Sequence, residues 1–386
     1  TDGLNDPQKE AVLHTDGPLM VLAGAGSGKT RVITHRIVHL IHQGTAPHNI
    51  LAVTFTNKAA AEMRERAIAL TQKYLPSDRA VIDSVPVVTT FHALGVRLLR
   101  EFHETMGLRR HFVIYDRSDS QKAVKQAVEE AQYDPKEFEP RKILSMISKA
   151  KGDAMSQLAF SDAAGSFFEE VVATVWEKYE RILREQDALD FDDLLVKTLR
   201  LLEDNATVRE TLQKRYHYIH VDEYQDTNKV QFNIMELLAD EAKNICVVGD
   251  IDQNIYSWRG ADIKNVLQFE KHFRDSTTIL LEENYRSTQT IISASNDIIK
   301  KNKNRVDKTV FTNNHEGEKI TRYAGMTGID EAEYVALTAR DLIADGADAT
   351  SIAVLYRTKF QSRSLEEAFL NYDVPYQLLG TKFFER

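Results

Sequence analysis

Short apolar, β-branched runs that end in polar residues recur along this chain, and helical stretches such as 58–70 separate them. This alternation predicts a parallel β-sheet with helices on both faces. Ligands of such folds bind beyond the carboxyl ends of the strands, where the polar residues of these runs lie. The predicted strands are 18–23, 50–56, 85–90, 218–222 and 245–249.

The length of 386 residues predicts two or three domains, and the contents of 42% hydrophobic and 28% charged residues are those of a globular protein. The net charge of −9 argues against a protein that coats nucleic acid through bulk positive charge, but it leaves room for a local basic groove. No apolar run is long enough to span a membrane, so we expect no membrane partner. The single cysteine, Cys246, lies in an apolar run. We interpret it as a buried core residue and expect the cytoplasm as its compartment.

The pattern changes between residues 104 and 188, where apolar residues recur at helical spacing. Because strand-like runs resume at 218, we interpret this stretch as a helical insertion in the first α/β domain. Its basic residues Arg141, Lys142, Lys149 and Lys151 are interpreted as a solvated helix face. From residue 277 a further α/β pattern is predicted, with strands at 278–282, 320–324 and 351–356 and a helix over 330–343.

Residues 23–30, Ala-Gly-Ala-Gly-Ser-Gly-Lys-Thr, join the first predicted strand to a helical stretch. Glycines let backbone N–H groups surround a phosphate, and the positive end of the helix points to the same place. In the pattern G-x4-G-K-[ST], the lysine reaches the β- and γ-phosphates and the hydroxyl ligates Mg²⁺. Ala23 departs from the first position of that pattern, so a glycine-rich turn without a phosphate is the alternative. The expected nucleotide contacts are Ala25, Gly26, Ser27, Gly28, Lys29 and Thr30.

The run Val-Asp-Glu-Tyr-Gln-Asp at 221–226 follows a later predicted strand. Asp222 suits the coordination shell of Mg²⁺, and the adjacent Glu223 suits activation of an attacking water. Adjacent carboxylates are common on surfaces, but together with the phosphate loop they predict nucleotide hydrolysis.

Residues 249–262 place Gln253 close to two large aromatic side chains, Tyr256 and Trp258. A glutamine amide can hydrogen-bond a terminal phosphate, and stacked rings hold single-stranded nucleic acid without reading its sequence. In an extended segment both rings project from one face. The alternative is that both are ordinary core aromatics. A further candidate is Arg286 in the run 283–287, which could reach a γ-phosphate as an arginine finger.

These motifs occur in the order found in the UvrD/PcrA/Rep group of superfamily 1A DNA helicases, which the chain resembles from residue 4 to residue 386. The resemblance implies an α/β P-loop NTPase fold: a RecA-like parallel sheet with a helical insertion and the first part of a second RecA-like domain. The implied domains are 1A (1–103 and 189–276), 1B (104–188) and the first part of 2A (277–386). The matching segments are Leu4-Asn5 with Gln8, 23–30, 54–60, 90–92, 222–226, 249–262, 284–287 and 355–358.

The resemblance also implies residue roles. Gln8 would read the adenine edge while Arg31 and Tyr285 sandwich the ring, Gln253 would sense the γ-phosphate, and Arg286 would be a finger from 2A. The implied cofactors are ATP and Mg²⁺, and the implied substrates are single-stranded DNA and single/double-strand junctions, with 3′-to-5′ movement in repair or replication. Repair or transcription proteins are further candidate partners, and we expect a monomer. The implied DNA contacts are Phe55, Asn57, Thr90, His92, Tyr256, Trp258, Arg259, Arg357 and Lys359.

Three departures from the family pattern stand out. Asn254 replaces the usual serine, and Lys359 replaces an asparagine, so it can contact a phosphate only as a point charge. The later motifs of the family are missing, and the chain ends where the 2B insertion would begin. We therefore expect this portion alone to bind ATP weakly and to unwind poorly. Two alternatives stay open: the helicase subunit of a helicase–nuclease, and a nucleotide-dependent DNA-binding module without motor activity.

Overall fold

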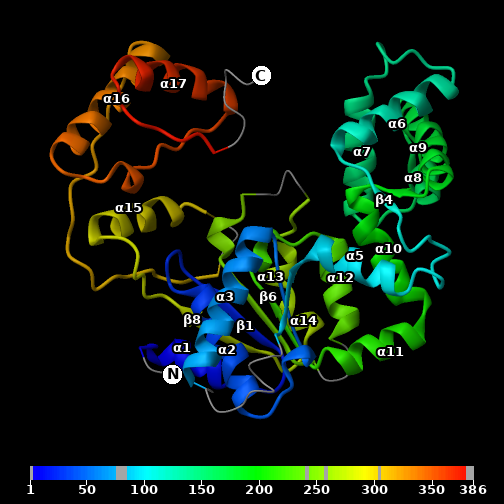
Figure 1. Ribbon diagram of the computed structural model, residues 1–386, viewed down its shortest axis with the longest axis horizontal. Coiled ribbons are helices and arrows are strands. Elements are labelled where there is room, and N and C mark those ends of the chain that lie inside the picture. Colours follow the sequence, from blue (N-terminus) through cyan, green and yellow to red (C-terminus); the bar gives the residue numbers. More distant parts are fainter. Residues whose placement is uncertain (1–2, 75–84, 240–242, 256–259, 303–305, 380–386) are drawn as a thin grey trace. The chain divides into compact units, whose positions relative to one another are not determined.

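A six-stranded parallel sheet in the order β3-β2-β6-β7-β1-β8 is the centre of the fold (Figure 1). The computed structural model describes residues 3–74, 85–239, 243–255, 260–302 and 306–379. The five strands predicted before residue 250 are confirmed, which establishes the α/β class. The strands of this sheet are β1 (Leu19–Ala23), β2 (Ile50–Thr54), β3 (Val87–Thr90), β6 (Tyr218–Val221), β7 (Ile245–Gly249) and β8 (Thr277–Leu281).

Helices connect the strands and cover both faces of the sheet, as β-α-β crossovers require. In the described residues, the helices from α1 to α11 are α1 (Asp6–Leu13), α2 (Lys29–His42), α3 (Asn57–Tyr74), α5 (Phe91–Glu101), α6 (Arg117–Glu130), α7 (Pro140–Gly152), α8 (Gln157–Ala163), α9 (Phe167–Glu185), α10 (Phe191–Asp204) and α11 (Ala206–Arg215). The later ones are α12 (Lys229–Leu238), α13 (Lys264–Leu267), α14 (Phe269–His272), α15 (Gln289–Ile299), α16 (Gly328–Ala344) and α17 (Ser362–Asn371). Short 3₁₀ turns are η1 (Pro47–Asn49), η2 (Tyr224–Asp226), η3 (Ile251–Gln253), η5 (Ala349–Ser351) and η6 (Lys359–Gln361).

Alternate residues of each strand pack into two separate cores, because successive side chains point to opposite faces of a sheet. Leu19 and Val21 join the core under α1, α2 and α3, while Met20 and Leu22 join the core under α5, α10 and α12. Cys246 is buried in the first of these cores, as predicted. Continuous burial on both faces explains why the strands read as unbroken apolar runs.

Strand β8 is the edge strand of this same sheet and pairs in parallel with β1. The sequence assigns this strand to a second α/β pattern, but Ile279 and Leu281 pack into the core below β1. A strand pattern alone does not identify the neighbouring strand, which is why the sequence misses the pairing. The predicted domain boundary at residue 277 stays a prediction.

Helices α6, α7 and α9, within the predicted insertion, share an apolar core of their own around Trp176 and Tyr179. The short strands β4 (Val113–Ile114) and β5 (Ala188–Leu189) pair in parallel where this region meets α10. Lys142 is exposed on α7, as expected for a solvated face, but Lys151 is buried. The interpretation of Lys151 as a solvated residue is therefore wrong.

The chain forms two compact units, residues 1–317 and 318–386. In the second unit α16 and α17 pack through small residues, Ala332, Ala336 and Ala368, and through Phe369. The predicted helix is confirmed as α16, but the strands predicted at 320–324 and 351–356 are wrong. In the described part of this unit, residues 320–324 and 352–356 form no strand, and Ser351 ends the turn η5. A strand needs hydrogen-bonding neighbours, which apolar sequence alone does not supply.

Among the described residues, no helix has the length and apolar content that crossing a membrane requires.

Candidate functional site

The loop between β1 and α2 has the geometry of an anion cradle. Gly26 and Gly28 have φ angles of +66° and +86°, which only glycine adopts without strain. Gly28 is also the N-cap of α2 and, lacking a side chain, leaves the first turn of this 14-residue helix without a side-chain cap. Backbone N–H groups at such a helix start attract phosphate. The loop is therefore suited to the phosphates of a nucleotide.

Two side chains from different strand ends meet at this loop. The Nζ of Lys29, at the start of α2, lies 2.6 Å from Oε2 of Glu223, directly after β6. The same carboxylate oxygen accepts a hydrogen bond of 2.9 Å from Nε2 of Gln225. Glu223 has a φ of +50°, a left-handed conformation that costs energy for a residue with a Cβ. Lys29 and Gln225 thus hold the carboxylate of Glu223, a residue with a strained backbone, against the phosphate loop.

The neighbouring Asp222 is buried, and its Oδ1 accepts a hydrogen bond of 3.0 Å from the backbone N–H of Glu223. Burial, and next the charge of Glu223, raise the pKa of Asp222 to about 7. A cation at this carboxylate would therefore be favoured. Asp222 and the hydroxyl of Thr30 are oxygen donors of the type Mg²⁺ prefers, and Mg²⁺ commonly takes only one or two protein ligands beside phosphates. The donor set fits Mg²⁺, and the described residues contain no cluster of three or more metal-binding side chains.

Gln253, in η3 after β7, is connected to these carboxylates through Gln225. The Nε2 of Gln253 donates to Oδ2 of Asp250 at 2.6 Å, and the backbone N–H of Asp250 donates to Oε1 of Gln225 at 2.9 Å. Asn254 donates from Nδ2 to the carbonyl of Gln225 at 2.6 Å, which gives this unusual residue a structural role. Gln225 is 1% exposed and was not predicted as a site residue, although it lies inside the 222–226 motif.

On the other side of the loop, Gln8 is buried and donates from Nε2 to the carbonyl of Ser27 at 2.8 Å. It closes a capping box with Asn5 at the start of α1. Asn5 in turn donates to Oε2 of Glu283 at 3.1 Å, and the hydroxyl of Tyr285 donates to the same oxygen at 2.6 Å. Glu283 therefore connects two predicted adenine contacts, and no sequence pattern singled it out.

The predicted finger lies beside the phosphate loop. Asn284 donates from Nδ2 to the carbonyl of Ala25 at 2.6 Å, and the backbone N–H of Tyr285 donates to the carbonyl of Gly26 at 3.0 Å. A Cβ placed on Gly26 would come within 2.8 Å of the Cβ of Arg286. Arg286 is exposed at this edge, as is Arg31 on α2. The backbone thus brings the positively charged Arg286, in addition to Lys29, to the rim of the loop.

Four of the predicted DNA contacts lie at or just beyond the carboxyl ends of the adjacent strands β2 and β3. Phe55 is half-buried, with its ring centroid 5.7 Å from that of Phe91 in an edge-to-face arrangement, and Asn57 begins α3. Thr90 is buried as the N-cap of α5, so its hydroxyl already accepts from the helix. Burial lowers the pKa of His92, whose ring is 5.4 Å from that of the exposed Phe191. We expect His92 to be neutral at pH 7.

The remaining predicted DNA contacts belong to other parts of the chain. Tyr256, Trp258 and Arg259 lie outside the described residues. Arg357 and Lys359 are exposed in the second unit.

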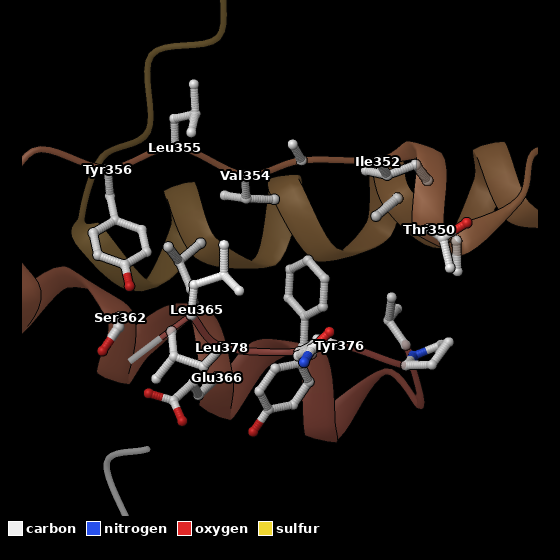
Figure 2. Close-up of a pocket in the computed structure, with 18 of the residues that line it drawn as sticks. Thr350, Ile352, Val354, Leu355, Tyr356, Ser362, Leu365, Glu366, Tyr376 and Leu378 are labelled. Atoms are coloured by element: carbon white, nitrogen blue, oxygen red, sulfur yellow. The ribbon is translucent and has the colours of Figure 1, made fainter. Parts of the chain in front are cut away.

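That unit contains an apolar pocket of about 670 Å³ between α16, α17 and two extended segments (Figure 2). Leu355 and Tyr376 are among its lining residues, whereas Arg357 and Lys359 are not. No predicted site residue lines this pocket.

The parallel sheet, the glycine loop and the carboxylates at neighbouring strand ends define a P-loop nucleotide-binding protein of the α/β class. Residues 4–274 match the family described as UvrD/REP helicase N-terminal domain, and residues 279–386 match the UvrD-like helicase C-terminal domain. The chain belongs to the UvrD/REP helicase family.

The chain is also similar to proteins that are named as DNA helicases. The chain is 46% identical over 385 residues to an ATP-dependent DNA helicase PcrA of Staphylococcus aureus, and 45% identical to that of Staphylococcus epidermidis. In both cases 99% of this chain aligns with 52% of the relative. The chain thus spans about half the length of these helicases.

Proposed function

We propose that this chain is the nucleotide-binding portion of an ATP-dependent DNA helicase that moves 3′-to-5′ along single-stranded DNA in repair or replication. The observation that carries the proposal is the continuous set of contacts from Lys29 through Glu223 and Gln225 to Asp250 and Gln253. It joins the phosphate loop to the ends of β6 and β7. The names of the relatives support DNA as the nucleic acid.

In the proposed reaction, Lys29 and the first turn of α2 bind the β- and γ-phosphates of ATP. Glu223 accepts the proton of the water that attacks the γ-phosphorus, and Gln253 holds a γ-phosphate oxygen or that water by its amide. Thr30 and Asp222 would hold Mg²⁺, which supplies charge neutralisation for the transferred phosphoryl group. Arg286 offsets the charge that develops in the transition state.

Coupling to DNA is proposed to run along the same edge of the sheet. Phe55 and His92 follow β2 and β3, while Glu223 and Gln253 follow β6 and β7. Because β2 and β6 are neighbours in the sheet, the proposed hydrolytic and strand-binding groups occupy adjacent parts of one edge. If hydrolysis changes the position of β6 relative to β2, both the hydrolytic groups and the strand-binding groups would move.

Steady-state ATP hydrolysis by residues 1–386, with and without single-stranded DNA, tests the proposal. We expect Mg²⁺-dependent hydrolysis that DNA stimulates, and weak unwinding, since these residues span about half of the compared helicases. Substrates with 3′ or 5′ single-stranded tails test the polarity. Nucleotide binding without any hydrolysis would instead favour a DNA-binding module without motor activity.

A further inference from the structure

Residues 306–311 cross the carboxyl ends of three neighbouring strands, in the order β7, β1, β8. This segment follows α15 and belongs to the part of the chain that matches the C-terminal family domain. It therefore brings residues of that domain onto the phosphate-loop edge of the first sheet. The contacts are the Phe311 N–H with the carbonyl of Glu282 after β8, Val310 against Gly24 after β1, and Lys308 with Asp250 after β7.

Lys308 is the charged residue of this segment that enters the site. Its side chain is 1% exposed, and its Nζ pairs with Oδ1 of Asp250 and lies 3.2 Å from Oδ2 of Asp252. Burying an ammonium group is costly unless it is paired, and here two carboxylates pair with it. The proposed reaction assigns no role to Lys308.

The carboxylate of Asp250 has two side-chain partners, Lys308 and Gln253, and its Oδ1 also accepts a hydrogen bond of 3.1 Å from the backbone N–H of Asp252. While Oδ1 pairs with Lys308, Oδ2 accepts the hydrogen bond from Nε2 of Gln253. An amide that donates to a fixed carboxylate has its carbonyl oxygen and second N–H directed by that bond. The orientation of the Gln253 amide therefore depends on where Lys308 holds Asp250. The backbone N–H of Asp250 extends the same contacts to Gln225.

We propose that Lys308 is a positioning residue for recognition of the γ-phosphate: it fixes Asp250, and through Asp250 it sets the orientation of the Gln253 amide. The segment 306–311 thus gives the C-terminal family domain a second route to the terminal phosphate, beside the proposed finger Arg286. This inference rests on the proposed function, because it requires that the loop binds ATP and that Gln253 reads its γ-phosphate.

A binding ratio separates positioning from mere stabilisation. The dissociation constants of fluorescent ADP and of a fluorescent, non-hydrolysable β,γ-imido analogue of ATP are measured on residues 1–386 with Mg²⁺. The ratio of the two constants reports γ-phosphate recognition and does not depend on turnover. For Lys308→Met we expect the preference for the ATP analogue to fall roughly tenfold, the usual effect of losing one hydrogen bond to a charged group.

Lys151→Met is the matched control, since Lys151 is also a buried lysine paired with carboxylates but lies away from the loop. Both variants are expected to lower stability, and only Lys308→Met is expected to lower the ratio. If Lys308→Met does not fold, the double variant Asp252→Asn/Lys308→Met reduces the uncompensated buried charge and keeps Asp250 in place. This double variant is expected to lose the preference for the ATP analogue over ADP to the same extent as Lys308→Met.

A double-mutant cycle with Gln253→Ala completes the test. If Lys308 acts through Gln253, adding Lys308→Met to Gln253→Ala lowers the preference no further. Two results would overturn the positioning role while leaving the proposed function intact. In one, the two substitutions together lower the preference by the product of their separate effects. In the other, Lys308→Met shifts both dissociation constants equally. Failure of the unaltered chain to bind either nucleotide would instead overturn the proposed function, and this inference with it.

Discussion

The Nζ of Lys29 and the Oε2 of Glu223 lie 2.6 Å apart, although 194 residues separate them in the chain. Lys29 follows β1 and Glu223 follows β6, and β7 lies between these strands in the sheet. A γ-phosphate would compete with Glu223 for the ammonium group. We therefore expect arrival of ATP to loosen this pair, and the released carboxylate to become available to the attacking water.

Glu223→Gln tests this assignment. The amide keeps the size and can still accept a hydrogen bond from Lys29, but it cannot take a proton from water. We expect the kcat of ATP hydrolysis to fall by about 10²- to 10⁴-fold, the usual contribution of a general base, with little change in ATP affinity. Steady-state hydrolysis and fluorescent-nucleotide titration measure the two quantities.

Glu62→Gln is the control, because Glu62 is an exposed carboxylate on α3. It is expected to leave both quantities unchanged. Retained turnover in Glu223→Gln would refute the role of Glu223.

Glu283 provides a second test, on the adenine side of the site. Burial, and next the hydrogen bond to Glu283, raise the pKa of Tyr285 to about 12. Without that bond the half-exposed ring is less well oriented. We expect Glu283→Ala and Tyr285→Phe each to weaken ATP binding roughly fivefold, as for one lost hydrogen bond, and together no more than either alone.

Binding of tripolyphosphate, which lacks the base, shows whether Glu283 supports the adenine contact or the phosphate loop. It should be unchanged in both variants. Equal weakening of ATP and tripolyphosphate would show that Glu283 supports the loop rather than the adenine contact.

The strand ends were predictable because parallel strands share one carboxyl edge, so polar residues after separate apolar runs must converge there. Glu223 follows from this rule, while Lys29 follows from the glycine-loop pattern at 23–30. Glu283 and Lys308 do not follow from either, since no local period relates Glu283 to Asn5 or Lys308 to Asp250. Apolar periodicity reports burial but not which neighbour covers a segment, which explains both the pairing of β8 and the burial of Lys151.

The buried Lys151 is expected to contribute to the stability of the helical region. Its Nζ lies 2.8 Å from Asp193, 2.9 Å from Asp190 and 3.0 Å from Glu180, which ties α7 and α9 to α10. Burial alone would lower the pKa of Lys151, but these carboxylates raise it well above its usual value. We expect Lys151→Met to lower the free energy of unfolding by about 3–5 kcal/mol, because it leaves buried carboxylates uncompensated.

Urea unfolding followed by circular dichroism measures this loss. Lys142→Met, on the exposed face of the same helix, should change the free energy of unfolding by less than about 0.5 kcal/mol. Similar small losses in both variants would contradict a structural role for the buried ion pairs.

The dependence of stability on pH tests the core of the sheet. His220 on β6 is buried, and burial, together with the nearby charge of Arg36, lowers its pKa to about 3. The unfolded chain, with a pKa near 6.5, therefore binds the proton first as the pH falls. The contribution of the neutral ring is complete above pH 6.5 and is lost progressively as the pH falls toward 3. Between pH 6.5 and 4.5 this loss amounts to about 2–3 kcal/mol.

His220→Leu removes the titrating group while keeping an apolar side chain, so its free energy of unfolding should fall less between pH 6.5 and 4.5, by about 2–3 kcal/mol. Other groups titrate alike in both proteins and cancel in the difference. Urea unfolding at several pH values gives the two slopes, with His48→Leu as a variant at an exposed histidine. Because the ring of His220 is buried and that of His48 is exposed, only His220→Leu should flatten the dependence of the free energy of unfolding on pH. Parallel curves for His220→Leu and the unaltered chain would mean that His220 takes up its proton in the folded state.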